Sequence, residues 1–260
     1  GSGALAGAPY PLDRESVAAE LGFEAVSRNS LDATADRDFV AEFLAACAIT
    51  QMHVSRLAEE VVLWASAEFG FVKLPDGFAT GSSIMPQKKN ADVAELARGR
   101  TGRVYGELMN ILVTLKGLPM AYNRDLQEDK AAVLGVLPVV VPTLRIFAAM
   151  LPELEFDFGR MRQASGEGFS LATDVADYLV KKGLPFRDAH GVVGRLVREC
   201  EERHCELNQL PFHVYREASP LFERDILGIT VESALAARDV VGGTAPERVR
   251  KAAAELRALV

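Results

Sequence analysis

Apolar residues recur at helical spacing over three long stretches of the chain. Residues 37–69 contain neither proline nor glycine, and their apolar positions repeat as on the buried face of a helix. The same pattern covers residues 91–116 and 127–150. A helix of the first length would extend for about 50 Å, which is longer than a compact chain of this size usually needs. The pattern therefore predicts a bundle of long helices that is shared between subunits.

Shorter helices are predicted on either side of these three. Residues 12–21 form one, with Asp13 as its N-cap, and the polar residues 24–35 are predicted to be a loop. Beyond Phe156 the chain has more glycines and shorter apolar periods, which predict helices over residues 157–164, 171–182, 186–204, 211–218 and 246–259. No stretch shows the alternation that is typical of a strand.

These patterns predict an all-α fold in two parts. A long-helix bundle covers residues 1–156, and a small all-helical C-terminal domain covers residues 157–260. Pro138 and Pro142 should bend the third long helix, because each removes a hydrogen-bond donor. The most apolar run, 131–144, is too short to cross a bilayer, so no membrane association is predicted.

Charge and cysteine content narrow the class of protein. The 260 residues carry a formal net charge of −7, which argues against nucleic acid or an acidic membrane surface as the main partner. Cys47, Cys200 and Cys205 lack the spacing of a disulfide framework and suit a reducing cytoplasm. His204 lies between the last two, but without a second ligand pair this grouping is predicted to be chance rather than a zinc site. No metal site is predicted.

Several polar side chains lie within the predicted long helices. His53 is predicted to be a packed core histidine rather than a catalytic one. Arg98, Arg100 and Arg103 are predicted to be solvated or to form salt bridges between subunits, rather than to bind a ligand.

One segment of ten residues concentrates polar chemistry. Gly81–Asn90 holds two serines, a glutamine and two lysines between two predicted helices. Gly81 frees the backbone, whereas Pro86 restricts it. Lys88 and Lys89 precede a helix N-terminus, where free N–H groups attract anions, and Asn90 suits its N-cap position. The residues alone fit either a mobile loop that closes over an anion or a solvated basic loop.

A family resemblance favours the first interpretation. The loop Gly-Ser-Ser-Ile-Met-Pro-Gln-Lys-Lys-Asn, residues 81–90, resembles the signature loop of the aspartase/fumarase superfamily, and its ending is similar to that of argininosuccinate lyases. Residues 122–130, Tyr-Asn-Arg-Asp-Leu-Gln-Glu-Asp-Lys, resemble the substrate segment of the same enzymes. A third match covers residues 30–34 and continues into residues 36–39. The resemblance extends over the whole chain.

The resemblance implies a reversible β-elimination that releases arginine and fumarate from argininosuccinate, without metal or organic cofactor. Such a reaction requires a base beside a carboxylate, a cation that holds the resulting dianion, and an acid for the departing nitrogen. The family's base corresponds to Ser82, and Lys88 would stabilise its oxyanion. The substrate-binding positions that the resemblance implies are Ser83, Gln87, Asn90, Arg37, Tyr122, Gln127 and Lys130.

The chain departs from the family pattern in two ways. Ala91 stands where the family has proline, which should loosen the loop by roughly 0.4–1 kcal/mol through chain entropy. The family's His-Thr-His-type segment, which supplies a histidine to the reaction, does not occur in this sequence. We therefore expect that an N-terminal part of the enzyme is missing, that the bundle is incomplete, and that the isolated chain is inactive.

The family builds each active site from three subunits, so the resemblance implies a homotetramer acting in arginine biosynthesis in the cytoplasm. An incomplete bundle exposes apolar faces, which favour self-association. Two other interpretations stay open. One is a structural protein on the same fold, similar to the delta-crystallins of the lens, and the other is a different fumarate-releasing lyase such as adenylosuccinate lyase.

Overall fold

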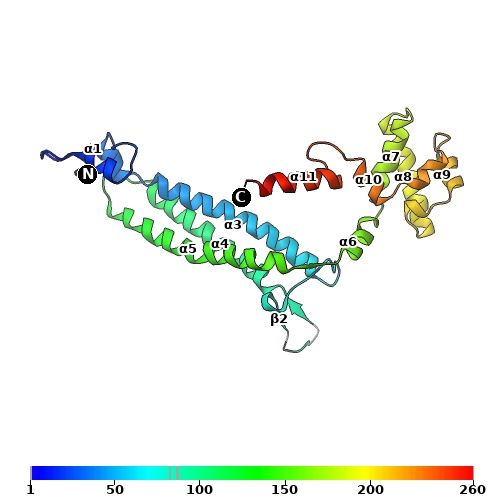
Figure 1. Ribbon diagram of the computed structural model, residues 1–260, viewed down its shortest axis with the longest axis horizontal. Coiled ribbons are helices and arrows are strands. Elements are labelled where there is room, and N and C mark those ends of the chain that lie inside the picture. The colour runs from blue at the N-terminus through cyan, green and yellow to red at the C-terminus, as the bar shows by residue number, and fades with distance from the viewer. Residues whose placement is uncertain (1, 82, 86–87, 260) are drawn as a thin grey trace. The chain divides into compact units, whose positions relative to one another are not determined.

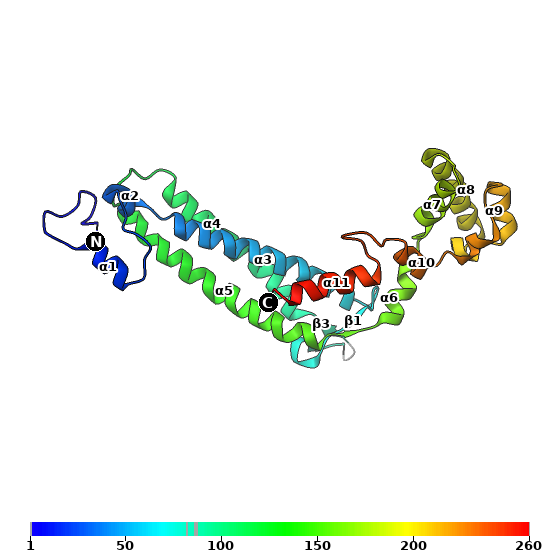
Figure 2. The same ribbon diagram turned by 45° about the horizontal axis from the view of Figure 1, so that its top comes forward.

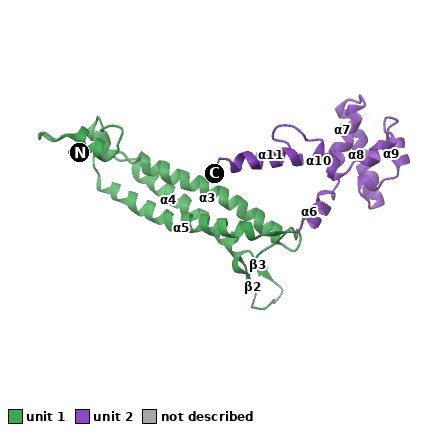
Figure 3. Ribbon diagram, viewed as in Figure 1, with its two compact units in different colours: residues 1–156 green, residues 157–260 purple. Residues whose placement is uncertain are grey.

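The chain forms two compact units of helices (Figure 3). The computed structural model describes residues 2–81, 83–85 and 88–259. Unit 1 covers residues 1–156 and unit 2 covers residues 157–260. The strands among the described residues are only two residues long and form two-stranded pairs, so the predicted all-α class is confirmed.

Three long helices form the body of unit 1 (Figures 1 and 2). They are α3 (Asp38–Ala65), α4 (Asp92–Leu115) and α5 (Glu128–Met150). The middle one in the chain, α4, runs in the opposite direction to the other two and packs against both (Figure 1). Leu44, Val104 and Val136 are fully buried where the three helices meet. The three helical patterns of the sequence are thus confirmed as one bundle.

The first of these helices ends earlier than predicted. Helix α3 stops at Ala65, four residues before the end of the apolar pattern at Phe69. The hydroxyl of Ser66 donates to the carbonyl of Leu63 at 2.7 Å, and Ser66 itself is extended. A serine that bonds to the local backbone competes with the helix ladder, which accounts for the early end.

Two short helices precede the bundle. In α1 (Arg14–Glu20) the Asp13 carboxylate accepts from the Ser16 N–H at 2.9 Å, as its predicted N-cap role requires. Residues 24–35 were predicted to be a loop, but Ser30–Ala35 form α2. The Asn29 side chain accepts from the N–H groups of Leu31 and Asp32 in the first turn, at 3.0 and 3.2 Å. A helix of six residues is too short to show an apolar period, so this cap was the only local signal.

Two small antiparallel pairs lie at the opposite end of the bundle. Strand β1 (Val72–Lys73) pairs with β4 (Glu155–Phe156). Strand β2 (Thr80–Gly81) pairs with β3 (Lys89–Asn90). A short 3-10 turn at Asp76–Phe78 lies between the first and second strands. The second pair closes the base of the polar loop.

Helix α5 is apolar on two opposite sides. It continues through Pro138 and Pro142, and with the flanking 3-10 turns it is long and apolar enough to cross a membrane by length and composition alone. Within this segment, one third of the most apolar stretch of residues is buried inside the chain. Val136 faces the bundle, whereas Leu134 and Val141 are exposed. A helix that is apolar all round is normally covered on every side.

Unit 2 contains a series of shorter helices. Their bounds match the predicted ranges to within two residues at each end, except for one six-residue helix that the pattern missed. That helix begins at a capping box in which Thr230 and Ser233 exchange hydrogen bonds. The helices are α6 (Phe158–Ser165), α7 (Ala172–Lys181), α8 (Phe186–Arg203), α9 (Phe212–Ala218), α10 (Val231–Ala236) and α11 (Pro246–Arg257).

Candidate active site

The substrate segment predicted from the sequence lies between α4 and α5. A 3-10 turn at Arg124–Gln127 leads directly into α5. The Gln127 amide donates to the Tyr122 hydroxyl at 2.8 Å, so these two predicted substrate-binding side chains are in contact. Asn123 donates to the carbonyl oxygens of Pro119 and Ala121, both at 3.1 Å. These bonds hold the turn that presents the pair.

Asp129 joins two more of the predicted residues, although the sequence analysis did not single it out. One carboxylate oxygen accepts from Arg37 Nε at 2.6 Å and the other from Lys130 Nζ at 3.0 Å. The exposed fractions of the Asp129 and Arg37 side chains are 10% and 17%, against 63% for Lys130. In the sequence, the signal for this role of Asp129 was a carboxylate next to a lysine in the first turn of a predicted helix.

The environment of Asp129 acts on its pKa in opposite directions. Burial is the largest influence and raises the pKa, but the hydrogen bonds from Lys130 and Arg37 and their charges together outweigh it. The pKa of Asp129 therefore lies below its ordinary value. The carboxylate stays ionised at neutral pH and fixes one cation from the start of α3 beside another from the start of α5.

A cavity of about 220 Å³ lies beside Arg37. Its lining comes from residues 32–38 on one side and from residues 115–126 on the other. Arg37 also donates to the backbone carbonyl of Asp36 at 2.6 Å, so its guanidinium is held at the cavity wall. The predicted residues Arg37, Tyr122, Gln127 and Lys130 are thus gathered at one end of the bundle.

The polar loop rises from a hairpin at the other end. Thr80 lies opposite Asn90, and Gly81 lies opposite Lys89. The Thr80 hydroxyl donates to the Asp92 carboxylate, and Lys89 forms an ion pair with Asp76. The hydrogen bond from Lys89 is the main reason why the pKa of Asp76 lies below its ordinary value. The base of the loop is therefore clamped on both sides.

The tip of the loop carries the predicted chemistry. Ser83 and Lys88 are exposed, and the Lys88 N–H donates to the Met85 carbonyl at 3.0 Å. In the described part of the chain, no carboxylate is paired with the Lys88 ammonium group. Ser82 and Gln87 lie outside the described residues.

The predicted N-cap role of Asn90 is wrong. Asn90 belongs to strand β3, and the residue at the N-cap of α4 is Ala91, which makes no capping bond through its side chain. The strand pairing with Thr80 occupies Asn90, and the bond from Thr80 to Asp92 ties the strand to the first turn of α4. Asn90 is half-buried, and its predicted substrate-binding role stays a prediction.

The loop and the substrate segment are far apart in one chain. The loop precedes α4, and the substrate segment follows it (Figures 1 and 2). The 24 residues of α4 separate them by about 36 Å at 1.5 Å per residue. The structure therefore brings together four of the predicted residues at one end of unit 1 and leaves the described loop residues at the other end.

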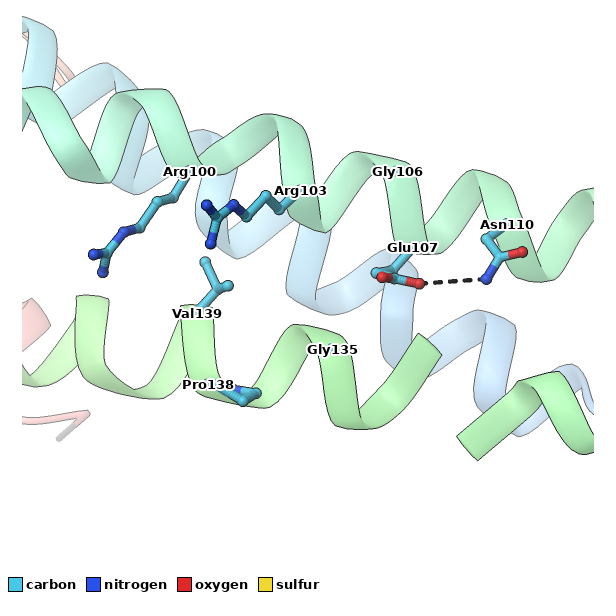
Figure 4. Close-up of a pocket in the computed structure, with 8 residues that line it drawn as sticks. All are labelled: Arg100, Arg103, Gly106, Glu107, Asn110, Gly135, Pro138 and Val139. Atoms are coloured by element: carbon cyan, nitrogen blue, oxygen red, sulfur yellow. Dashed lines mark hydrogen bonds between the residues drawn. The ribbon is translucent and has the colours of Figure 1, made fainter. Parts of the chain in front are cut away.

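A third polar feature lies midway along the bundle. Arg100 and Arg103 extend from α4 toward α5 over an open groove of about 610 Å³ (Figure 4). Glu107 packs so closely on Gly135 that a Cβ atom there would meet its carboxylate at 2.8 Å. None of the predicted site residues lines this groove.

Two predictions about the long helices can be checked directly. Arg98 is exposed, as predicted for a solvated side chain, and it also forms an ion pair with Glu59 on α3 of the same chain. His53 is exposed, so the prediction of a core histidine is wrong. The apolar residues of α3 do not mark a single face of the helix, because many of its exposed positions are also apolar.

Comparison with known proteins shows the family of the chain. A model of the Lyase family matches residues 1–106, and a model of the argininosuccinate lyase C-terminal region matches residues 169–236. The argininosuccinate lyase of Moorella thermoacetica is 55% identical over 261 residues, and that of Dehalococcoides mccartyi strain BAV1 is 54% identical over 260 residues. Each match covers 100% of this chain and 56% of the relative. The chain spans little more than half the length of these relatives.

Solved structures agree on the fold. An EDDS lyase variant with bound fumarate has a TM-score of 0.79 at 29% sequence identity, and the match covers 98% of this chain and 53% of that one. A class II fumarase from Schistosoma mansoni, at 17% identity and a TM-score of 0.61, shares the fold alone. The Lyase family model and the shared fold show that the chain belongs among the lyases. Within that class, the chain belongs to the argininosuccinate lyase family.

Proposed function

We propose that this chain is the loop-bearing and C-terminal part of an enzyme that cleaves argininosuccinate reversibly to arginine and fumarate. The observation that carries the proposal is identity of 53–56% to curated argininosuccinate lyases over 96–100% of the chain. The chain also retains a serine, lysine and asparagine in its loop and a tyrosine, glutamine and lysine in its substrate segment. No organic or metal cofactor is needed for this reaction.

The proposed chemistry divides between the two segments. Ser82 removes the proton next to a carboxylate, and Lys88 stabilises both the serine oxyanion and the dianionic intermediate. Lys88 is exposed to solvent, where a charge interacts weakly with its surroundings. The loop must therefore close over substrate and exclude water before this lysine acts at full strength.

The remaining residues bind and orient the substrate. Ser83, Gln87 and Asn90 bind the fumarate part beside the loop. Tyr122, Gln127 and Lys130 bind the other part of the molecule, and Arg37 supports them through Asp129, which holds Arg37 and Lys130 together.

A single copy of the chain cannot bring both segments to one substrate. They are separated by the length of α4, about 36 Å, whereas a molecule of this size, comparable to three or four extended residues, spans about 12 Å. We therefore propose that each site takes its loop and its substrate segment from different copies. This supports a homo-oligomer, which we propose to be a tetramer, and the exposed apolar side of α5 suits such an assembly. We place it in the cytoplasm.

Mixing inactive variants tests the shared site. The chain is joined to the N-terminal part of the Moorella thermoacetica relative, and two chimeras are made, one with Ser82→Ala and one with Lys130→Met. Each alone should release fumarate from argininosuccinate at least about 100-fold more slowly than the parent chimera. Unfolded together and refolded, they should recover activity in roughly a quarter of the sites, because random assembly pairs an intact loop with an intact segment that often.

Three outcomes would contradict the proposal in different ways. An active parent chimera with no recovery in the mixture would mean that one copy supplies both segments. An assembled parent chimera that releases fumarate from adenylosuccinate or EDDS but not from argininosuccinate would overturn the substrate. An assembled chimera inactive on all three would favour a structural protein.

A further inference from the structure

Two cysteine side chains touch at the end of helix α8. Cys200, in the last turn of α8, is fully buried in the core of unit 2. Cys205, two residues beyond the end of the helix, is half-buried. Cys205 packs against the core cluster that contains Cys200, so the thiols are neighbours in space as well as in sequence.

The backbone builds this contact. His204 ends α8 in the left-handed conformation, with φ of 52°. The chain reverses there, and the Cys205 N–H donates to the Cys200 carbonyl at 3.0 Å. When a helix ends at a left-handed residue with this hydrogen bond, the two side chains at the positions of Cys200 and Cys205 normally pack against each other. The pairing is therefore a product of the helix terminus rather than of one side-chain rotamer.

A pocket reaches this pair from solvent. It has a volume of about 370 Å³ and is lined by both cysteines, by His204 and by Glu206, among others. Cys47, the remaining cysteine, is buried in unit 1. Of the three cysteines in the chain, Cys205 is partly exposed and Cys47 and Cys200 are buried, so a small reagent reaches the pair through Cys205.

We propose that Cys200 and Cys205 form a reversible disulfide when the protein meets a low-molecular-weight disulfide such as oxidised glutathione. The Cys205 sulfur, after losing its proton to solvent, attacks one sulfur of the reagent and forms a mixed disulfide, and the first thiolate leaves. The Cys200 sulfur, after losing its proton, then attacks the Cys205 sulfur, and the second thiolate leaves. Two protein thiols and one small disulfide thus become one protein disulfide and two small thiols.

The order of these steps follows from the surroundings of the two thiols. Burial, together with the neighbouring Cys205, raises the pKa of Cys200 to about 12, so Cys200 is a poor first nucleophile. When Cys205 has become a mixed disulfide, its charge no longer opposes ionisation of Cys200. Burial still opposes ionisation of Cys200, and the second step proceeds because the partner sulfur already lies beside it.

A metal is a poorer occupant of this pair. Among the residues that the structure describes, no group of three or more His, Cys, Asp or Glu side chains is arranged to hold a metal ion. Structural zinc takes four protein ligands, whereas two sulfurs in contact need no further partner to form a disulfide.

Mass spectrometry and thiol counting test the proposal. The folded chain is treated with oxidised glutathione and then denatured in acid. The number of free thiols should fall from the three of the sequence to one, the intact mass should fall by two hydrogen atoms, and a peptide linking Cys200 to Cys205 should appear. Dithiothreitol should restore all three thiols. The control variant Cys47→Ser should react in the same way and retain no free thiol.

Variants of the pair separate the two steps. Cys200→Ser should hold a stable glutathionyl group on Cys205, because the second nucleophile is missing. Cys205→Ser should stay unmodified while folded. The proposal is overturned if the original chain keeps three free thiols, or if it retains a glutathionyl group at Cys205 without losing the Cys200 thiol.

Discussion

The two units of the chain differ in how they bury their apolar residues. Unit 2 has one core, in which Phe222, Leu179 and Leu196 are 0–2% exposed. Tyr178 stacks on the Phe222 ring and Tyr215 meets its edge. Unit 1 has two smaller clusters between its long helices, and large apolar side chains such as Leu134 remain 67% exposed. Unit 2 gathers its buried apolar residues into one cluster, whereas unit 1 divides them between two.

This difference indicates where each unit obtains its stability. Burial of apolar surface is the main driving force for folding, and unit 2 achieves it with residues 169–229. The long helices of unit 1 carry apolar residues on sides that no part of their own bundle covers. Contiguous exposed patches of this kind mark association surfaces. Unit 1, which also carries the candidate site, is the part that other copies should complete.

Truncation of the unit 2 core should have the largest effect. Phe222→Ala removes a fully buried ring, and such changes cost about 3–5 kcal/mol. Hydrogen exchange should become much faster in α7–α9 and stay unchanged in α3–α5. The exposed Phe186 is the matched control, and Phe186→Ala should cost less than about 1 kcal/mol. Equal loss of protection in both units would contradict the independence of their cores.

A charge on the exposed side of α5 should weaken association without unfolding the chain. Leu134→Glu would bury a carboxylate if this side is covered by another copy, at a cost of about 2 kcal/mol or more. Sedimentation should then show association about 30-fold weaker, with helix content unchanged. Leu259→Glu, at a site that is 83% exposed in unit 2, should leave association as it was. Unchanged association of the Leu134 variant would mean that this side of α5 faces solvent.

Removing the charge of Asp129 should loosen the substrate end of unit 1. Asp129→Asn leaves Arg37 and Lys130 without their shared carboxylate, which should lower the free energy of unfolding by about 2 kcal/mol. Denaturant unfolding at neutral pH measures this loss. The neighbouring Glu128→Gln variant, at an exposed position, controls for loss of one negative charge and should change stability by less than about 0.5 kcal/mol.

The pH dependence of this variant tests the cause. Because the pKa of Asp129 is lower in the folded chain than its ordinary value, its stabilisation is fully present above an ordinary pKa near about 4. The stabilisation is lost as pH falls through the lower, folded value. The difference in stability between the parent chain and Asp129→Asn should therefore be constant from pH 7 to about 5 and shrink in more acidic solution. A difference that grew on acidification would contradict the ion-pair account.

The smallest effect should be a gain in the stability of unit 2. His204 adopts φ of 52° at the end of α8, a conformation that suits glycine better. His204→Gly should stabilise unit 2 by roughly 0.5–1 kcal/mol, measured as slower hydrogen exchange in α8. Glu202→Gly, inside the same helix, should instead destabilise it by about 1 kcal/mol. Loss of stability in both variants would show that the histidine side chain contributes more than its backbone conformation costs.

Much of the fold could be predicted from local pattern. The three long helices and five of the shorter ones follow from apolar periods, and Asp13 was a recognisable cap. The six-residue helices α2 and α10 were missed because one turn and a half shows no period. Asn90 was misplaced because its pairing with Thr80, ten residues earlier, overrides its preference for an N-cap.

The site was predictable in composition but not in arrangement. Tyr122, Gln127 and Lys130 are close in sequence, and the 3-10 turn at Arg124–Gln127 brings Gln127 into contact with Tyr122. Asp129 looked like an ordinary acid in a first helical turn, until its contact with Arg37, ninety-two positions earlier, gave it a structural role. No local pattern contains a contact of that sequence separation.

The sequence by itself determined most of the helical segments and which family the chain belongs to, and it predicted which residues carry the chemistry, because these depend on residue type and short spacing. Only the tertiary structure decided that Arg37 and Lys130 share one carboxylate, that two cysteines pack together at the end of α8, and that the loop lies a helix length from the substrate segment. These follow from how the long helices pack and where the chain turns back. Residue spacing measures distance along the chain, whereas chemistry depends on distance in space.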